Sequence, residues 1–128
     1  MRLLIDSHVV IWWATDPDRI SDTVDALMLD PDNEIFVSVA SVWEIAIKVE
    51  NGKLNFDQRI LDSFDSRMKQ LGWTVLPVLT GEAVAAPRLP GLHTDPFDRL
   101  LAAQAIRHGL FVATVDKAFV ALGARVIW

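Results

Sequence analysis

The sequence predicts an α/β protein in which helices cover both faces of a five-stranded parallel sheet. Five short apolar segments alternate with helical segments along the 128 residues, and such alternation produces parallel β-α-β units. The first segment, residues 2–5, is apolar throughout after Arg2, as expected for a strand buried on both faces. The length suits a single domain over residues 1–128 and leaves no room for two ordinary ones.

The individual elements follow from hydrophobic periodicity and from turn signals. Strands are expected at residues 2–5, 34–37, 73–76, 110–114 and 125–128. Helices are expected at residues 7–14, 21–30, 39–50, 57–71, 81–86, 95–108 and 117–122. Gly52, Gly72 and Gly109 follow three of these helices, and glycine readily takes the left-handed conformation that ends a helix. The helix at 57–71 has the clearest apolar face, made by Ile60, Leu61, Phe64, Met68 and Leu71.

Composition excludes several classes of protein. Hydrophobic residues make up 52% of the chain, which excludes disorder as the main state. The longest apolar run, residues 9–14, is far shorter than the roughly 20 residues of a membrane span. The apolar start of the chain soon meets Asp6, unlike a secretory signal, so a cytoplasmic protein without a membrane segment is expected. The absence of cysteine excludes disulfides and thiolate zinc sites.

The distribution of charge directs attention to particular carboxylates. Seventeen acidic and 12 basic side chains give a net charge of −5, which argues against a broad phosphate-binding surface. Residues 1–34 hold eight acids and two bases, whereas the rest of the chain is nearly balanced. A few individual acids therefore matter more than the total.

Three aspartates are expected near one edge of the sheet. Asp6 ends the first strand and Asp116 lies just past the fourth, and the carboxyl ends of parallel strands meet at the same edge. Asp98 reaches that edge if the 95–108 helix enters the fourth strand from its far end. The alternative interpretation is structural: Asp6 and Asp116 are common turn residues, and Asp98 complements the helix dipole behind the N-cap Asp95.

Glu44 is an acid within an otherwise apolar helix. The polar residues of that helix form one narrow stripe: Ser41, Glu44, Lys48 and Asn51. A helix that is apolar almost all round is buried, and a buried carboxylate is costly unless it is paired, protonated or bound to a metal. An i,i+4 pair of Glu44 with Lys48 on a solvated stripe is an equally good interpretation.

Taken together, these motifs resemble the PIN-domain ribonucleases, specifically the VapC-type toxins of toxin–antitoxin pairs. The resemblance covers the whole chain and rests on four segments in order: Leu3-Leu4-Ile5-Asp6-Ser7-His8, Ser41-Val42-Trp43-Glu44-Ile45 with Lys48, Asp95-Pro96-Phe97-Asp98-Arg99-Leu100-Leu101, and Thr114-Val115-Asp116. One minor departure is Ser7, where many relatives carry threonine. Each motif is weak alone, but four in order at this length make a specific signal.

The resemblance implies a PIN-like three-layer fold with strand order 3-2-1-4-5 and an acidic pocket that hydrolyses RNA. The pocket comprises Asp6, Glu44, Asp98 and Asp116. Converging carboxylates repel one another, and a divalent cation with oxygen ligands, Mg²⁺ or Mn²⁺, relieves the repulsion. Asp6 and Asp98 are expected as direct ligands, with Glu44 and Asp116 acting directly, through water or on a second ion.

Further residues are expected to support the metal site or contact RNA. Ser7 and Thr114 offer hydroxyls behind the ligands. Lys48 and Arg99 offer cations for the RNA, and Asp95 borders the pocket. His93 could touch RNA, although such a histidine is more often an ordinary loop residue.

The resemblance also implies a VapB-type antitoxin, a homodimer and higher toxin–antitoxin assemblies. Residues 9–13 are apolar in succession and include Trp12 and Trp13, more than one helix on one sheet is expected to bury. We therefore expect an antitoxin to cover this helix and predict that Trp12→Glu weakens the complex more than the fold. Burial by neighbouring helices or by a second copy is the alternative, and the 39–49 helix shows the same surplus.

Three other classes fit less well. A phosphoacceptor receiver domain needs paired acids after the first strand, where Asp6 stands alone. A dehalogenase-type phosphatase needs Asp-x-Asp there, whereas the chain has Asp6-Ser7-His8. A PIN domain that only binds usually lacks one of the acids, and none is missing here.

Overall fold

The computed structural model describes all 128 residues and contains one parallel sheet of order β3-β2-β1-β4-β5. The strands are β1 (Arg2–Ile5), β2 (Glu34–Ser38), β3 (Thr74–Leu76), β4 (Phe111–Ala113) and β5 (Arg125–Ile127). Strand β1 is central and pairs with β2 and β4, with Ile5 opposite both Val37 and Ala113. The strand order expected from the resemblance is therefore confirmed.

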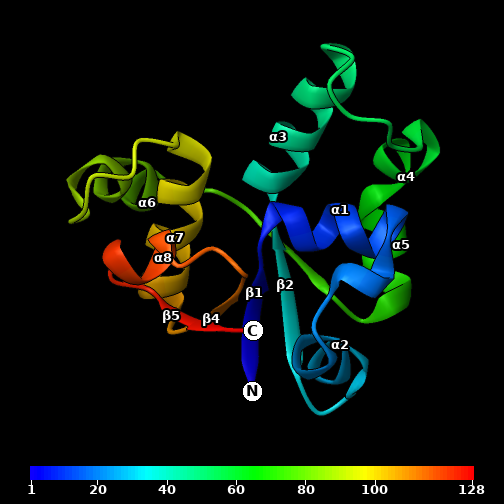
Figure 1. Ribbon diagram of the computed structural model, residues 1–128, viewed down its shortest axis with the longest axis horizontal. Helices are drawn as coiled ribbons and strands as arrows, with labels where there is room; N and C mark the ends of the chain where they lie inside the picture. The colour runs from blue at the N-terminus through cyan, green and yellow to red at the C-terminus, as the bar shows by residue number, and fades with distance from the viewer.

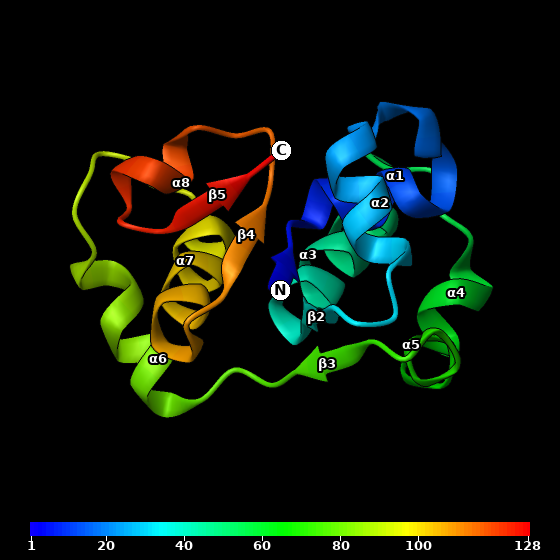
Figure 2. The same ribbon diagram turned by 90° about the horizontal axis from the view of Figure 1, so that it is seen from below.

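Helices cover both faces of the sheet. They are α1 (Ser7–Thr15), α2 (Asp22–Leu29), α3 (Val39–Glu50), α4 (Gln58–Asp62), α5 (Phe64–Leu71), α6 (Thr80–Ala85), α7 (Pro96–His108) and α8 (Ala118–Ala121), with 3-10 turns η1 (Pro17–Arg19) and η2 (Ala86–Arg88). Figures 1 and 2 show α1, α2, α4 and α5 on one side and α6, α7 and α8 on the other. The three-layer architecture is confirmed.

The alternation of side chains along β1 divides the interior into two cores. Leu3 and Ile5 face the core made with α1, α2, α3 and α5. Leu4 faces the opposite core, where it packs with Leu101 of α7 and Val112 of β4. Each fully buried aliphatic side chain of this kind contributes about 1.5–3 kcal/mol, so both helical layers are anchored to the strand that carries Asp6 at its end.

The helix expected at residues 57–71 is two helices, and the prediction of one continuous helix is wrong. Helix α4 ends at Asp62 and α5 begins at Phe64, with Ser63 between them at φ −118° and ψ 24°. The Ser63 hydroxyl donates to the carbonyl of Arg59 at 2.6 Å, and a serine hydroxyl bonded back to the preceding turn bends or interrupts a helix. Elsewhere the expected bounds differ from the observed ones by no more than one residue.

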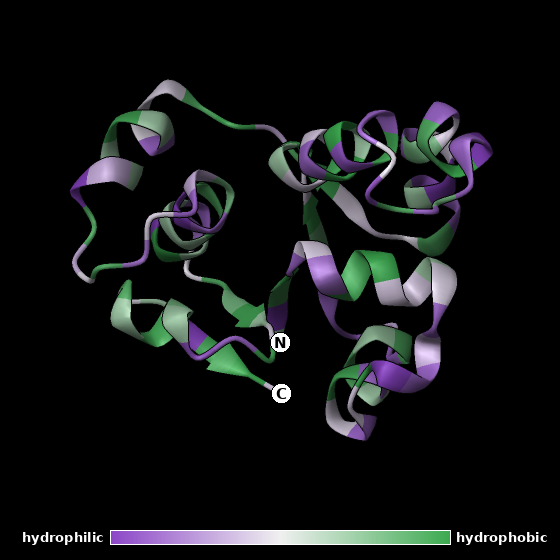
Figure 3. Ribbon diagram, turned by 45° about the horizontal axis from the view of Figure 1, so that its top comes forward, coloured by the Kyte–Doolittle hydropathy of each residue, from purple (hydrophilic) through white to green (hydrophobic).

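Helix α1 is covered by its own chain, so the expectation that it leaves surplus apolar surface is wrong. Trp12 is 9% exposed and packs edge-on against Trp128, with the Arg19 guanidinium 4.5 Å from its ring centroid. Trp13 is half-buried against Trp73. Figure 3 shows a hydrophobic stretch of α1 after its hydrophilic start, with paler residues towards its C-terminal end. Neighbouring segments, the alternative considered above, bury Trp12.

The apolar surplus on α3 is real. Trp43 is 61% exposed and contacts Phe97 edge-on at 5.5 Å between ring centroids. None of the helices combines the length and the apolar character needed to cross a bilayer.

Candidate active site

The carboxyl ends of β1 and β4 place Asp6 beside Thr114. Because Ile5 and Ala113 are paired in register, the next residue of each strand leaves the sheet at the same edge. The Asp6 amide donates to the carbonyl of Ala113 at 3.1 Å. The Thr114 hydroxyl donates to Asp6 Oδ2 at 2.8 Å, and Asp6 is only 1% exposed. Thr114 therefore supports Asp6, as expected from the sequence.

Asp6 also begins helix α1. Its Oδ1 accepts from the amide of His8 at 3.3 Å, so the carboxylate acts as the N-cap. His8 Nδ1 lies 3.7 Å from Asp6 Oδ2. The nearby carboxylate of Asp6 raises the pKa of His8 above its usual 6.5, against the opposing effect of burial. The turn-residue and functional interpretations of Asp6 are therefore compatible.

Asp116 is held next to Asp6 through the same threonine. The Asp116 amide donates to Thr114 Oγ1 at 3.0 Å, and Asp116 Oδ1 accepts from the amide of Ala118 at 2.9 Å. One hydroxyl thus links the carboxylate after β1 to the backbone after β4. The side chain of Asp116 is partly exposed, and its second oxygen has no hydrogen-bond donor from the protein.

Helix α7 brings Asp98 to this edge of the sheet. Asp98 Oδ2 lies 2.6 Å from His93 Nε2, and one donor atom each of His93, Asp98 and Asp116 lies within 4.8 Å of the other two. Burial raises the pKa of Asp98 to about 6, and the charges of Asp95 and Asp6 act in the same direction. The hydrogen bond with Asp98 raises the pKa of His93. Asp98 is thus a desolvated acid among other acids.

Asp95 and Asp98 divide the two roles that the sequence leaves open. Asp95 Oδ1 accepts from the amides of Phe97 and Asp98, at 2.8 Å and 3.2 Å, and so caps α7. Asp98 is free of capping and faces His93. Asp95 therefore acts as the helix cap, and its predicted contact with RNA stays a prediction.

Glu44 combines the two interpretations proposed for it. It is 6% exposed, and its Oε2 lies 3.1 Å from Lys48 Nζ, which is the expected i,i+4 pair. Its Oε1 is buried and has no hydrogen-bond partner. Leaving a buried carboxylate oxygen unpaired costs free energy, so this atom fits a site that takes up a further donor or cation. Ser7 donates to Ser41 Oγ at 2.9 Å and joins α1 to α3 beside Glu44.

Arg99 is engaged with the backbone of its own chain, so its predicted contact with RNA stays a prediction. Its guanidinium donates to four backbone carbonyls: those of His93 (2.5 Å), Ala86 (3.2 Å), Leu89 (2.9 Å) and Gly91 (2.9 Å). It therefore fixes the loop that carries His93 to Asp98. The pair of His93 with Asp98 was not expected from the sequence, where the one signal is a histidine two residues before the helix cap.

The donor set fits a divalent cation. Asp98, Asp116 and His93 could contact one ion directly, whereas both oxygens of Asp6 already accept protein hydrogen bonds. The free Oε1 of Glu44 is a further acceptor. Carboxylates without cysteine suit Mg²⁺ or Mn²⁺.

Comparison with known proteins identifies the family. A family model described as PIN domain matches residues 3–124. The chain belongs to the PIN domain family. This PIN domain is 33% identical over 119 residues to Ribonuclease VapC22 of Mycobacterium tuberculosis (strain ATCC 25618 / H37Rv), covering 90% of this chain and 87% of the relative. The VapC-type resemblance is thereby confirmed.

Solved structures share the fold of this PIN domain. VapBC2 from Rickettsia felis, bound to a DNA fragment from their promoter, superposes with a TM-score of 0.73 at 16% identity, covering 99% of this chain and 98% of that chain. FitAcB from Neisseria gonorrhoeae gives a TM-score of 0.64 at 21% identity, covering 98% and 96%. At such identities the similarity concerns the fold.

Proposed function

We propose that this PIN domain is a metal-dependent endoribonuclease toxin of the VapC type, acting on RNA in the cytoplasm. The observation that carries the proposal is the gathering of acids from separate segments at one sheet edge, with Asp98 and Asp116 close enough to share an ion. The 33% identity to a VapC ribonuclease supports RNA as the substrate.

Asp98 and Asp116 would hold the ion, Mg²⁺ or Mn²⁺, with Asp6 behind them. When bound, the ion would neutralise charge on the scissile phosphate and make water a stronger acid. Thr114 keeps the Asp6 carboxylate facing the pocket by donating to Oδ2. This donor also offsets part of the repulsion between Asp6 and its acidic neighbours.

Glu44 is the candidate proton acceptor. Lys48 engages Oε2, which leaves Oε1 free to take a proton from the attacking water. The Lys48 ammonium is partly exposed and would also attract the RNA backbone. Ser7 bonds to Ser41 and holds together the first turns of α1, which Asp6 caps, and of α3, which carries Glu44.

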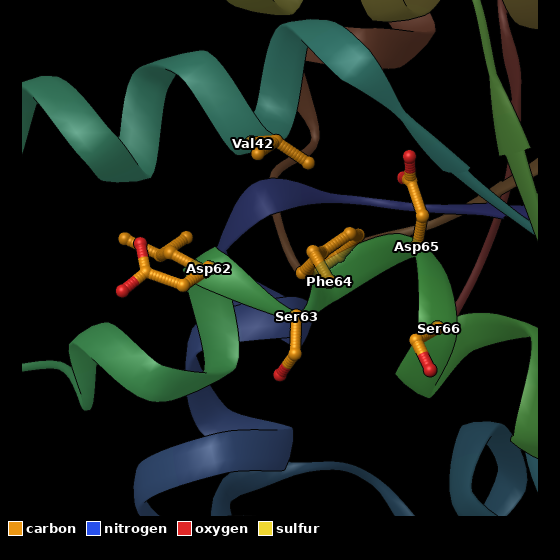
Figure 4. Close-up of a pocket in the computed structure, with 7 residues that line it drawn as sticks. Val42, Asp62, Ser63, Phe64, Asp65 and Ser66 are labelled. Atoms are coloured by element: carbon orange, nitrogen blue, oxygen red, sulfur yellow. The ribbon is translucent and has the colours of Figure 1, made fainter.

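A hollow of about 450 Å³ between α3 and the junction of α4 and α5 is our candidate surface for the inhibitory antitoxin. Figure 4 shows Val42 of α3 facing Phe64, with Asp62 and Asp65 on either side. An apolar anchor flanked by basic side chains complements such a surface. We assign the antitoxin to this hollow rather than to Trp12, because Trp12 is buried. The exposed side chains of Trp43 and Val39 on α3 are the candidate contacts with a second copy of this chain, in a homodimer or a higher assembly.

The decisive experiment is RNA cleavage by the Asp6→Asn variant. We expect cleavage in Mg²⁺ or Mn²⁺ to be lost while the fold is kept, because the amide retains the shape of the carboxylate but not its charge. Asp32→Asn, in an exposed turn, is the matched control and should cleave like the wild type. Undiminished cleavage by folded Asp6→Asn protein would refute the assignment.

A further inference from the structure

The cluster beside α7 contains a nitrogen donor, which an all-oxygen magnesium site lacks. His93 Nε2 lies 2.6 Å from Asp98 Oδ2, and Asp116 offers an oxygen within 4.8 Å of the donor atoms of both. Donor atoms that share one ion at about 2.1 Å lie about 3–4 Å apart, so small side-chain rotations bring all three to one ion. We propose that His93 is a metal ligand and that this site therefore binds Mn²⁺ and Co²⁺ more tightly than Mg²⁺.

The position of His93 is built by the fold. Arg99 donates to the carbonyl of His93 itself and to those of Leu89 and Gly91 in the same loop. Gly91 has φ +86°, and a Cβ there would lie 3.0 Å from the carbonyl oxygen of Ala121, so the loop passes close to α8. The backbone of His93 is thus fixed, and its imidazole is held by Asp98 Oδ2, so the side chain needs little further ordering to coordinate an ion.

The chemistry of the donors decides the metal. Mg²⁺ prefers oxygen ligands and gives up its water reluctantly, whereas imidazole suits first-row transition metals. Affinity for a mixed nitrogen and oxygen site rises from Mn²⁺ towards Co²⁺. Two carboxylates and one imidazole therefore favour Mn²⁺ and Co²⁺ over Mg²⁺, even though the site contains no thiolate. This inference rests on the proposed metal-dependent function and names the ion that the same site prefers.

A competing role for His93 makes the opposite prediction. If His93 only hydrogen-bonds to Asp98 in the metal-free protein and leaves when an ion enters, its removal would favour every ion equally. If His93 is a ligand, its removal would weaken Mn²⁺ and Co²⁺ selectively. The ratio of affinities, rather than any single affinity, separates the two roles.

The test is a calorimetric titration of the metal-free protein with MnCl₂, CoCl₂ and MgCl₂ in the absence of RNA. For His93→Gln, which replaces the nitrogen donor by an amide, we expect the preference for Mn²⁺ over Mg²⁺ to fall at least about tenfold. His8→Gln is the matched control, since His8 lies beside Asp6 but outside the three-residue cluster, and it should keep the wild-type preference. Circular dichroism establishes that both variants are folded.

The wild-type protein supplies a second readout that needs no variant. Pulsed electron paramagnetic resonance of the Mn²⁺-loaded protein should show coupling to an imidazole ¹⁴N nucleus, which His8→Gln retains and His93→Gln loses. Absence of this coupling in the wild type, or an affinity ratio unchanged by His93→Gln, overturns the proposal. Since neither measurement involves RNA, a protein that selects Mn²⁺ but cleaves no RNA would refute the proposed function alone.

Discussion

At the scale of single residues, Asp98 is the acid whose environment most opposes its charge. Burial raises its pKa from 3.8 to about 6, and the hydrogen bond with His93 only partly offsets this. A group whose pKa is raised on folding stabilises the fold below its unfolded pKa and loses that effect as pH rises through the folded one. The raised pKa of His93 acts in the same direction. The contribution of Asp98 to the stability of the metal-free protein should therefore fall as the pH rises from about 4 to about 6, and that of His93 should fall above about pH 6.5.

The Asp98→Asn variant should remove much of this pH dependence. At pH 8 we expect its metal-free form to be more stable than the wild type by up to about 3 kcal/mol, from about 1.4 kcal/mol per pKa unit. At pH 5 the gain should be about half as large, because Asp98 of the folded wild type is then largely protonated while the unfolded chain is already ionised. Thermal unfolding in a chelating buffer at both pH values measures the difference. Equal stability of the two proteins at pH 8 would contradict the burial argument.

Asp6 and Asp116 are predictable from sequence because strand ends determine where they lie. Asp6 and Asp116 follow strands whose apolar character is unmistakable, and parallel strands deliver them to one edge. The contact of His93 with Asp98 depends instead on the path of an irregular loop. Hydrogen bonds from Arg99 to backbone carbonyls set that path. Because every residue carries a carbonyl, no pattern of side chains in the sequence marks these acceptors.

At the scale of elements, the loop before α7 depends on one guanidinium. Arg99→Lys keeps the charge but replaces a planar fork by a single ammonium, which cannot serve four carbonyls at once. We expect a loss of about 2 kcal/mol in unfolding free energy, with faster amide exchange confined to residues 86–94. Hydrogen exchange followed by mass spectrometry measures both the rate and the place.

The neighbouring Arg88 is the control for this loop. It is exposed, and Arg88→Lys should leave the exchange of residues 86–94 unchanged. Similar exchange in the two variants would mean that the loop is held by packing on α7 and α8 rather than by Arg99.

The packing of α1 gives a second prediction at this scale. Trp12 is enclosed by Trp128 and Arg19, so Trp12→Ala should cost about 3–5 kcal/mol of unfolding free energy. The exposed Trp43 is a control of the same residue type, and Trp43→Ala should cost less than about 1 kcal/mol in the monomer. Chemical denaturation of both variants makes the comparison. A Trp12→Ala protein as stable as the wild type would contradict the burial of Trp12.

Helices α1, α4 and α5 show which features of the fold could not be predicted from the sequence. Periodicity and caps give nearly every boundary, since burial and capping are local. The break at Ser63 escapes prediction because the apolar face of residues 57–71 continues across it, while one hydroxyl bond diverts the backbone. The burial of Trp12 escapes because the covering residue Trp128 lies at the far end of the chain.

At the scale of the whole molecule, stability and metal binding are linked through the acidic pocket. The net charge is −5, and the four candidate acids account for most of that excess. An ion that binds only the folded chain stabilises it by mass action, by about 2.7 kcal/mol at a concentration of 100 Kd. For a domain of this size that corresponds to a rise in Tm of roughly 10 °C.

We therefore expect Mg²⁺ or Mn²⁺ to raise the Tm of the wild type, and Asp98→Asn to reduce that rise by more than half. The variant loses a direct ligand, so its affinity for the ion falls. Its metal-free form already lacks part of the repulsion between carboxylates, so ion binding adds less stability. Differential scanning fluorimetry against each metal chloride, with KCl at matched ionic strength, isolates the specific effect from screening. Asp32→Asn replaces an exposed acid in a turn and serves as the control, which should respond like the wild type. Melting curves that do not move at saturating metal would mean that the four acids do not form a shared cation site, whatever their proximity in the fold.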